Sequence, residues 1–134
     1  MSEPSGAPTV LVIEDDPGIQ MTVRLSLEVG GFHVTLASSA EEALELLPGL
    51  APAVILLDVT LPGMDGWSFL AHLRDTDALH DQGIVVMSAH ASEEIAARAA
   101  EAGAQGHIAK PFDVDELIDL VGKVAAQRLS DPGR

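Results

Sequence analysis

Short apolar runs alternate with amphipathic segments along the whole of this chain. The runs are rich in Val, Ile and Leu and are typical of strands buried on both faces of a sheet. They predict strands at residues 9–13, 32–36, 53–57, 84–87 and 106–109. After each run, apolar residues recur every three or four positions, as in helices that cover a sheet. This alternation predicts an α/β fold in which parallel strands are joined by right-handed helical crossovers, with helices on both faces.

Local signals predict where two of these helices begin and end. Ser39 followed by Glu42 predicts a capping box at the start of the second helix, and Pro48–Gly49 is predicted to end it. The fourth helix, Ser92 to Ala102, is rich in Ala and has few large apolar residues besides Ile95. Its packing should therefore be comparatively easy to remodel.

Length and composition are those of one compact domain. The 134 residues, 47% of them hydrophobic, suffice for a single core. We expect residues 1–8 to be a flexible arm, residues 9–129 to form the domain and residues 130–134 to be a frayed tail. This organisation predicts a stand-alone domain with no output domain after it.

The charge balance excludes several classes of partner. Seven basic and twenty-one acidic residues give a formal net charge of −14, which repels nucleic acids and anionic membranes, so we expect neither as a partner. The chain has no cysteine, which excludes disulfides and Cys-ligated zinc. No apolar run reaches the roughly 18 residues of a membrane span, and the first residues lack a signal-peptide pattern. A cytoplasmic protein is expected.

Polar side chains follow four of the five predicted strands. Glu14 and Asp15 follow the first strand, Asp58 the third, Ser88 the fourth and Lys110 the fifth. Because the carboxyl ends of parallel strands meet at one edge of the sheet, we expect these side chains to share one cleft.

This cleft has the chemistry of a site for a divalent cation and a phosphoryl group. Asp15, Asp58 and the backbone carbonyl of Thr60 can supply the protein ligands of Mg²⁺, or of Mn²⁺ in its place. Asp58 can also act as a nucleophile that forms an acyl phosphate. Lys110 can neutralise the phosphoryl oxygens, and Ser88 can donate a hydrogen bond to one of them.

In this order and spacing, the four signals resemble the receiver domain of two-component response regulators, over about residues 9–129. The matching motifs are Glu14–Asp15, Asp58 with residues 61–66, Ser88–Ala89 and Lys110–Phe112. The resemblance implies a doubly wound, flavodoxin-like sheet with strand order 2-1-3-4-5. It also implies a cis peptide bond between Lys110 and Pro111.

The resemblance further implies a function and a role for each site residue. Asp58 would accept phosphate from a phosphohistidine of a sensor histidine kinase or a histidine phosphotransfer protein. Asp15 and Thr60 would ligate the metal with help from Glu14, while Ser88 and Lys110 would contact the phosphoryl group. The domain would then signal to an unknown downstream protein by a conformational switch. It would be no enzyme beyond catalysing its own phosphorylation and dephosphorylation.

Two histidines are candidates for tuning the switch. His107 stands where the family usually has a Tyr or Phe that swings inward when the domain is phosphorylated, and a histidine there would make the inward state depend on pH. The alternative is a partly exposed edge-strand residue without a role. His90, with Thr60, could set the lifetime of the phosphoryl group, or be a solvated loop residue. The fourth and fifth helices form the expected signalling face and the expected contact of a homodimer.

Three other interpretations remain open at this stage. An aspartyl-phosphate phosphatase carries a second Asp two residues after its nucleophile, where this chain has Thr60. A flavin-binding carrier of similar topology needs a phosphate loop after the first strand, where this chain is acidic. The chain could also be the receiver fragment of a larger DNA-binding regulator or hybrid kinase.

Overall fold

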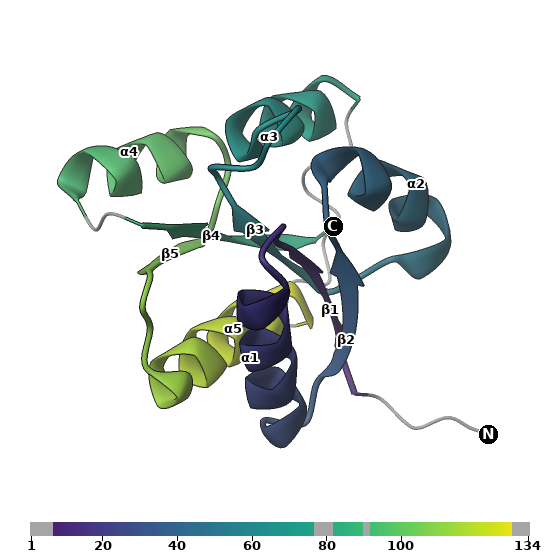
Figure 1. The fold of residues 1–134 in the computed structure, drawn as a ribbon, viewed down its shortest axis with the longest axis vertical. Coiled ribbons are helices and arrows are strands. Elements are labelled where there is room, and N and C mark those ends of the chain that lie inside the picture. Colours follow the sequence, from purple (N-terminus) through teal and green to yellow (C-terminus); the bar gives the residue numbers. More distant parts are fainter. Residues whose placement is uncertain (1–6, 77–81, 90–91, 130–134) are drawn as a thin grey trace.

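The computed structural model describes residues 7–76, 82–89 and 92–129. A parallel five-stranded sheet lies at its centre, with strand order β2-β1-β3-β4-β5, as the resemblance predicted (Figure 1). The strands are β1 (Thr9–Ile13), β2 (His33–Ala37), β3 (Val54–Asp58), β4 (Gly83–Ser88) and β5 (Gly106–Ala109).

Helices cover both faces of the sheet. Figure 1 shows α1 and α5 on one side of the sheet and α2, α3 and α4 on the other. The helices are α1 (Pro17–Val29), α2 (Ala40–Leu50), α3 (Gly66–Asp75), α4 (Glu93–Glu101) and α5 (Val114–Leu129). The predicted fold class, a doubly wound parallel sheet, is therefore confirmed.

Alternation of side chains along the central strands builds a core on each face of the sheet. Leu11 and Ile13 of β1 pack with α2 and α3, whereas Val10 and Val12 pack with α1 and α5. Successive strand residues point to opposite faces, and both faces are covered, so continuous apolar runs are favourable here. The two cores fix the directions of β1 and β3 and thereby the positions of the residues that follow them.

The capping residues lie close to their predicted places. Ser39 Oγ accepts a hydrogen bond from the Glu42 backbone N–H at 3.0 Å. The Glu42 carboxylate accepts a hydrogen bond from the Ser38 N–H at 2.7 Å. In a standard capping box it would accept from the next residue, Ser39. Asp16, which precedes the proline at the start of α1, accepts from the Gly18 and Ile19 N–H groups.

The predicted end of α2 was wrong. The helix continues through Pro48 and Gly49 to Leu50, and Ala51 then adopts a left-handed conformation with φ of 48°. Proline removes one backbone donor, but the Ala51 N–H still bonds to the Leu47 carbonyl at 3.2 Å and closes the last turn.

Several smaller features also follow from the described residues. The strands β2 and β3 begin and end one residue later than predicted, so Asp58 is the last residue of its strand rather than the first residue after it. The peptide bond between Lys110 and Pro111 is cis, as the resemblance implied. None of the helices in the described part of the chain has both the length and the apolar character that crossing a membrane requires.

Candidate functional site

Asp58 is buried at the carboxyl end of β3, in the middle of the sheet. The residue is only 2% exposed to solvent. The backbone N–H and the hydroxyl of Thr60 both donate to Asp58 Oδ1, each at 2.9 Å. Two donors on one oxygen fix the direction of the carboxylate before any ligand binds.

Gly66, at the start of α3, allows the chain to pass close behind Asp58. A Cβ atom at this position would lie 2.7 Å from the Asp58 carbonyl oxygen and 2.6 Å from the Val59 Cα. Both are backbone atoms and cannot give way cheaply. Glycine is thus required where the first turn of α3 lies against the end of β3.

Lys110 joins two buried carboxylates from opposite parts of the sequence. Its Nζ lies 2.8 Å from Asp58 Oδ2 and 3.0 Å from Glu14 Oε1. Glu14 follows β1, Asp58 ends β3 and Lys110 follows β5, so the sheet topology brings all three together. These three residues therefore meet at one edge of the sheet, as the order of the strands predicted.

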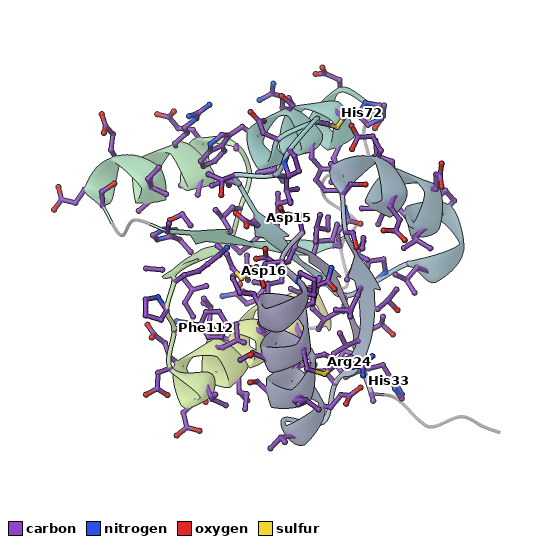
Figure 2. The ribbon with its side chains drawn as sticks, in the orientation of Figure 1. Asp15, Asp16, Arg24, His33, His72 and Phe112 are labelled. Carbon is purple, nitrogen blue, oxygen red and sulfur yellow. The ribbon has the colours of Figure 1, made fainter. Side chains whose placement is uncertain are left out.

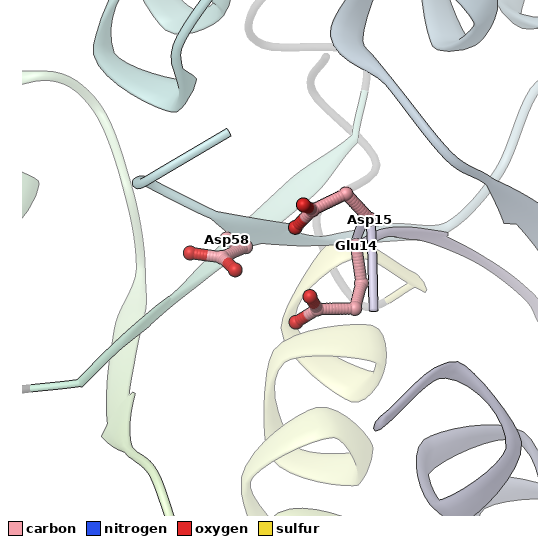
Figure 3. A group of neighbouring side chains, drawn as sticks. All are labelled: Glu14, Asp15 and Asp58. Atoms are coloured by element: carbon pink, nitrogen blue, oxygen red, sulfur yellow. The ribbon is translucent and has the colours of Figure 1, made fainter. Parts of the chain in front are cut away.

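Three carboxylates gather at the ends of β1 and β3. Figure 3 shows Glu14, Asp15 and Asp58 side by side, and oxygen atoms from all three lie within 4.8 Å of one another. Glu14 and Asp58 are buried, whereas Asp15 is exposed. Figure 2 shows Asp15 and Asp16 where the chain passes from β1 into α1. A set of hard oxygen donors with one solvent-facing member fits Mg²⁺, which keeps several waters.

The burial and pairing of these groups shift their pKa values in different directions. Burial raises the pKa of Glu14, and its bonds to the Asp16 N–H and Lys110 only partly offset this. Burial also acts to raise the pKa of Asp58, but the bonds from Lys110 and Thr60 outweigh it and lower the pKa. For Lys110, burial acts to lower the pKa, and the two carboxylates outweigh it and raise the pKa. These pKa shifts favour the charged forms of both Lys110 and Asp58.

Ser88 ends β4 at the same edge of the sheet and touches a histidine. Its carbonyl oxygen accepts from the Lys110 N–H at 2.8 Å, which ties the end of β4 to the end of β5. Its side-chain Oγ lies 3.2 Å from Nε2 of His107 on β5. His107 therefore contacts Ser88, the residue predicted to bind a phosphoryl oxygen. His90 lies outside the described residues.

Sequence reasoning missed Gln20 at this site. Gln20 Nε2 on α1 donates to the Glu14 carbonyl oxygen and to Ser38 Oγ, which joins the ends of β1 and β2. A polar residue on a helix that also has an exposed face carries no distinctive sequence signal, so this contact could be found only from the fold.

A surface pocket opens beside Lys110. It has a volume of about 310 Å³ and is lined by Ile19 and Thr22 of α1 and by Lys110, Pro111 and Phe112. Figure 2 labels Phe112, which lies just before α5. The pocket places apolar surface next to the charged site.

Comparison with known proteins gives one consistent family. The response regulator receiver domain family matches residues 10–122. The response regulator Rre1 of Synechocystis is 33% identical over 99% of this chain, which spans 58% of the length of that protein. The sporulation initiation phosphotransferase F of Bacillus subtilis is 31% identical over 85% of this chain and 90% of its own length.

Solved structures agree in fold. The receiver domain of the Francisella response regulator 1452 superposes with a TM-score of 0.83 at 32% identity, covering 90% of this chain and 98% of that one. The chemotaxis protein CheY4 of Vibrio cholerae gives a TM-score of 0.82 at 27% identity, covering 89% and 99%.

Proposed function

The chain belongs to the response regulator receiver domain family of two-component systems, and we propose that Asp58 is the residue on which it is phosphorylated. The observation that carries this proposal is the contact between Lys110 Nζ and Asp58 Oδ2 at 2.8 Å, within a cluster of three carboxylates. A buried carboxylate that is fixed, charged and paired with a cation is suited to attack phosphorus.

In the proposed reaction, an Asp58 oxygen attacks the phosphorus of a phosphohistidine. A P–O bond forms, the P–N bond breaks, and the imidazole nitrogen leaves with the electron pair. Lys110 exchanges its contact with Asp58 for one with a phosphoryl oxygen, and Ser88 donates to another. Because the side chain of Lys110 is already 18% exposed, the exchange needs only a small movement at the rim of the site. In the separate dephosphorylation step, water attacks the same phosphorus and the P–O bond to Asp58 breaks. Inorganic phosphate and a proton are released, and Asp58 regains its carboxylate.

Glu14, Asp15 and Asp58 would hold Mg²⁺, or Mn²⁺, together with the carbonyl oxygen of Thr60. The cation supplies positive charge opposite the phosphoryl oxygens, as in other phosphoryl transfers. Glu14 accepts hydrogen bonds from the Asp16 N–H and from the Lys110 ammonium, each at 3.0 Å, and these contacts support a secondary role for it beside the exposed Asp15.

The proposed donor is a sensor histidine kinase or a histidine phosphotransfer protein. The pocket beside Lys110 supports this, because it offers the donor apolar surface next to a residue that contacts Asp58. Signalling to a downstream protein, and a homodimer through α4 and α5, remain predictions. We propose that turnover is limited to the domain's own phosphorylation and dephosphorylation, whose rate His90 and Thr60 would tune.

The test is the intact mass after incubation with Mg²⁺ and acetyl phosphate. We expect wild type to gain the mass of one phosphoryl group and Asp58→Asn to gain none. Asp75→Asn, at the exposed end of α3, is the matched control and should behave as wild type. A wild-type protein without added mass, or equal labelling of Asp58→Asn, would contradict the proposal. Steady turnover of a small phosphomonoester would instead support a phosphatase.

A further inference from the structure

The side-chain contact between Ser88 and His107 has no role in the reaction described above. The two residues come from neighbouring strands, and Ser88 is only 4% exposed. Its Oγ lies 3.2 Å from His107 Nε2. The ring therefore contacts the serine in this structure, whereas the family resemblance implied a ring that swings inward on phosphorylation. A different role for His107 follows from this contact.

Two proton arrangements satisfy this contact. In the first, the Ser88 hydroxyl donates its proton to an unprotonated Nε2. In the second, Nε2–H donates to Ser88 Oγ, and the hydroxyl proton can turn toward another acceptor. A hydroxyl has one proton and two acceptor lone pairs, so it cannot donate to the ring and to a phosphoryl oxygen at the same time.

We propose that phosphorylation selects the second arrangement and that His107 is a positioning residue for the phosphoryl group: it donates Nε2–H to Ser88 Oγ and so directs the hydroxyl proton toward phosphorylated Asp58. This inference rests on the proposed function of Asp58. A phenylalanine at position 107 could not act in this way, because it has no donor.

The experiment compares two substitutions of His107. His107→Gln keeps an N–H donor that does not titrate, and His107→Phe keeps a ring without a donor. The phosphorylated fraction is measured by intact mass with limiting acetyl phosphate and Mg²⁺. We expect His107→Phe to lower the ratio of phosphorylated to free protein about fivefold, the factor that one hydrogen bond of about 1 kcal/mol provides. His107→Gln, which keeps the donor, should restore the ratio to that of wild type.

A spectroscopic measurement on the wild type makes the test independent of folding of the variants. Long-range proton–nitrogen correlation of ¹⁵N-histidine protein reads the protonation of each ring nitrogen. We expect Nε2 of His107 to carry a proton in the phosphorylated protein. An unprotonated Nε2 there, or a His107→Phe protein that is phosphorylated as fully as wild type, would overturn the inference but leave Asp58 as phosphoacceptor. His72→Gln on the exposed side of α3 is the control. A wild type that gains no phosphate would overturn both proposals.

Discussion

The Asp58 site and helix α4 are held in place to very different degrees. Every residue of β3 is buried, and the Asp58 carboxylate receives bonds from Thr60 and Lys110. In α4, Ala99 is the one fully buried residue, and the other side chains are exposed or half-buried. Yet α4 follows β4, which lies beside β3 in the same sheet.

This difference fits two different requirements. A nucleophile, a cation and metal ligands must hold their geometry before phosphate arrives, so they benefit from rigid strands. An element that changes position on phosphorylation must have alternatives only slightly higher in free energy, which requires few buried apolar contacts. The substitutions below test whether the two regions really differ in this way.

Lys110→Met should have the largest effect, because it leaves Glu14 and Asp58 buried without their cation. Methionine keeps most of the apolar stem. Removing one partner of a buried ion pair typically costs about 3 kcal/mol or more, so we expect a loss of about this size in urea unfolding at pH 7. Mg²⁺, or Asp58→Asn in the same chain, should recover part of it by removing the carboxylate repulsion.

Lys123→Met is the matched control for that substitution. The chain has only these two lysines, and Lys123 is exposed on α5. Its replacement should change the free energy of unfolding by no more than about 0.5 kcal/mol. Equal losses for both lysine variants would show that the charged site is no more tightly constrained than the surface.

Gly66→Ala should have the second largest effect, at about 2 kcal/mol, because the new Cβ would overlap backbone atoms of Asp58 and Val59. It should also lower phosphorylation, since the end of β3 must shift. Gly49→Ala in α2 is the control, because a Cβ there meets nothing within 4 Å. Alanine is the better helix former, so this control should be neutral or slightly stabilising. Two variants of equal stability and labelling would refute the close approach behind Asp58.

The pH dependence of stability should show a smaller effect at Glu14. Burial raises its pKa above the ordinary value of 4.5, so the charged form is disfavoured in the folded protein. Glu14→Gln should therefore be more stable than wild type at pH 7 without metal. This advantage should shrink as the pH falls through the raised pKa, where folded wild-type Glu14 becomes protonated, and should be gone below the ordinary value of 4.5. Glu45→Gln, exposed on α2, is the control and should be as stable as wild type at pH 7. A Glu14→Gln protein less stable than wild type at pH 7 would reverse the sign that burial implies.

Most of the fold was predictable because it depends on patterns that the sequence repeats. The buried runs of β1, β3 and β4 are continuous and apolar, and parallel topology then places Glu14, Asp58 and Lys110 at one edge. The wrong end of α2 shows the limit. Proline is unfavourable in a helix on local grounds, but near the end of α2 tertiary packing of Leu47 and Leu50 outweighs that preference.

Contacts between side chains were much less predictable than the residues that make them. The sequence indicated Ser88 and His107 as candidates, but not that they touch, since this depends on the register of β4 against β5. The contact of Gln20 with Glu14 depends likewise on how α1 lies beside the sheet. Such details follow from the orientation of whole elements, which one-dimensional patterns do not specify.

Arg98→Gln should have the smallest effect on stability and the most local one. Its guanidinium lies 4.3 Å from the centroid of the Trp67 ring and connects α4 to α3. An exposed contact of this kind contributes about 0.5 to 1 kcal/mol, so global unfolding in urea should change by no more than that. Because Ala99 is the only fully buried residue of α4, the lost contact should instead accelerate amide hydrogen exchange within this helix and leave β3 unchanged. Arg24→Gln on α1, away from any tryptophan, is the control and should leave exchange in α4 as it is in wild type. If exchange in β3 and α4 accelerated together, the two regions would belong to one cooperative unit. Helix α4 could then not change position independently of the Asp58 site.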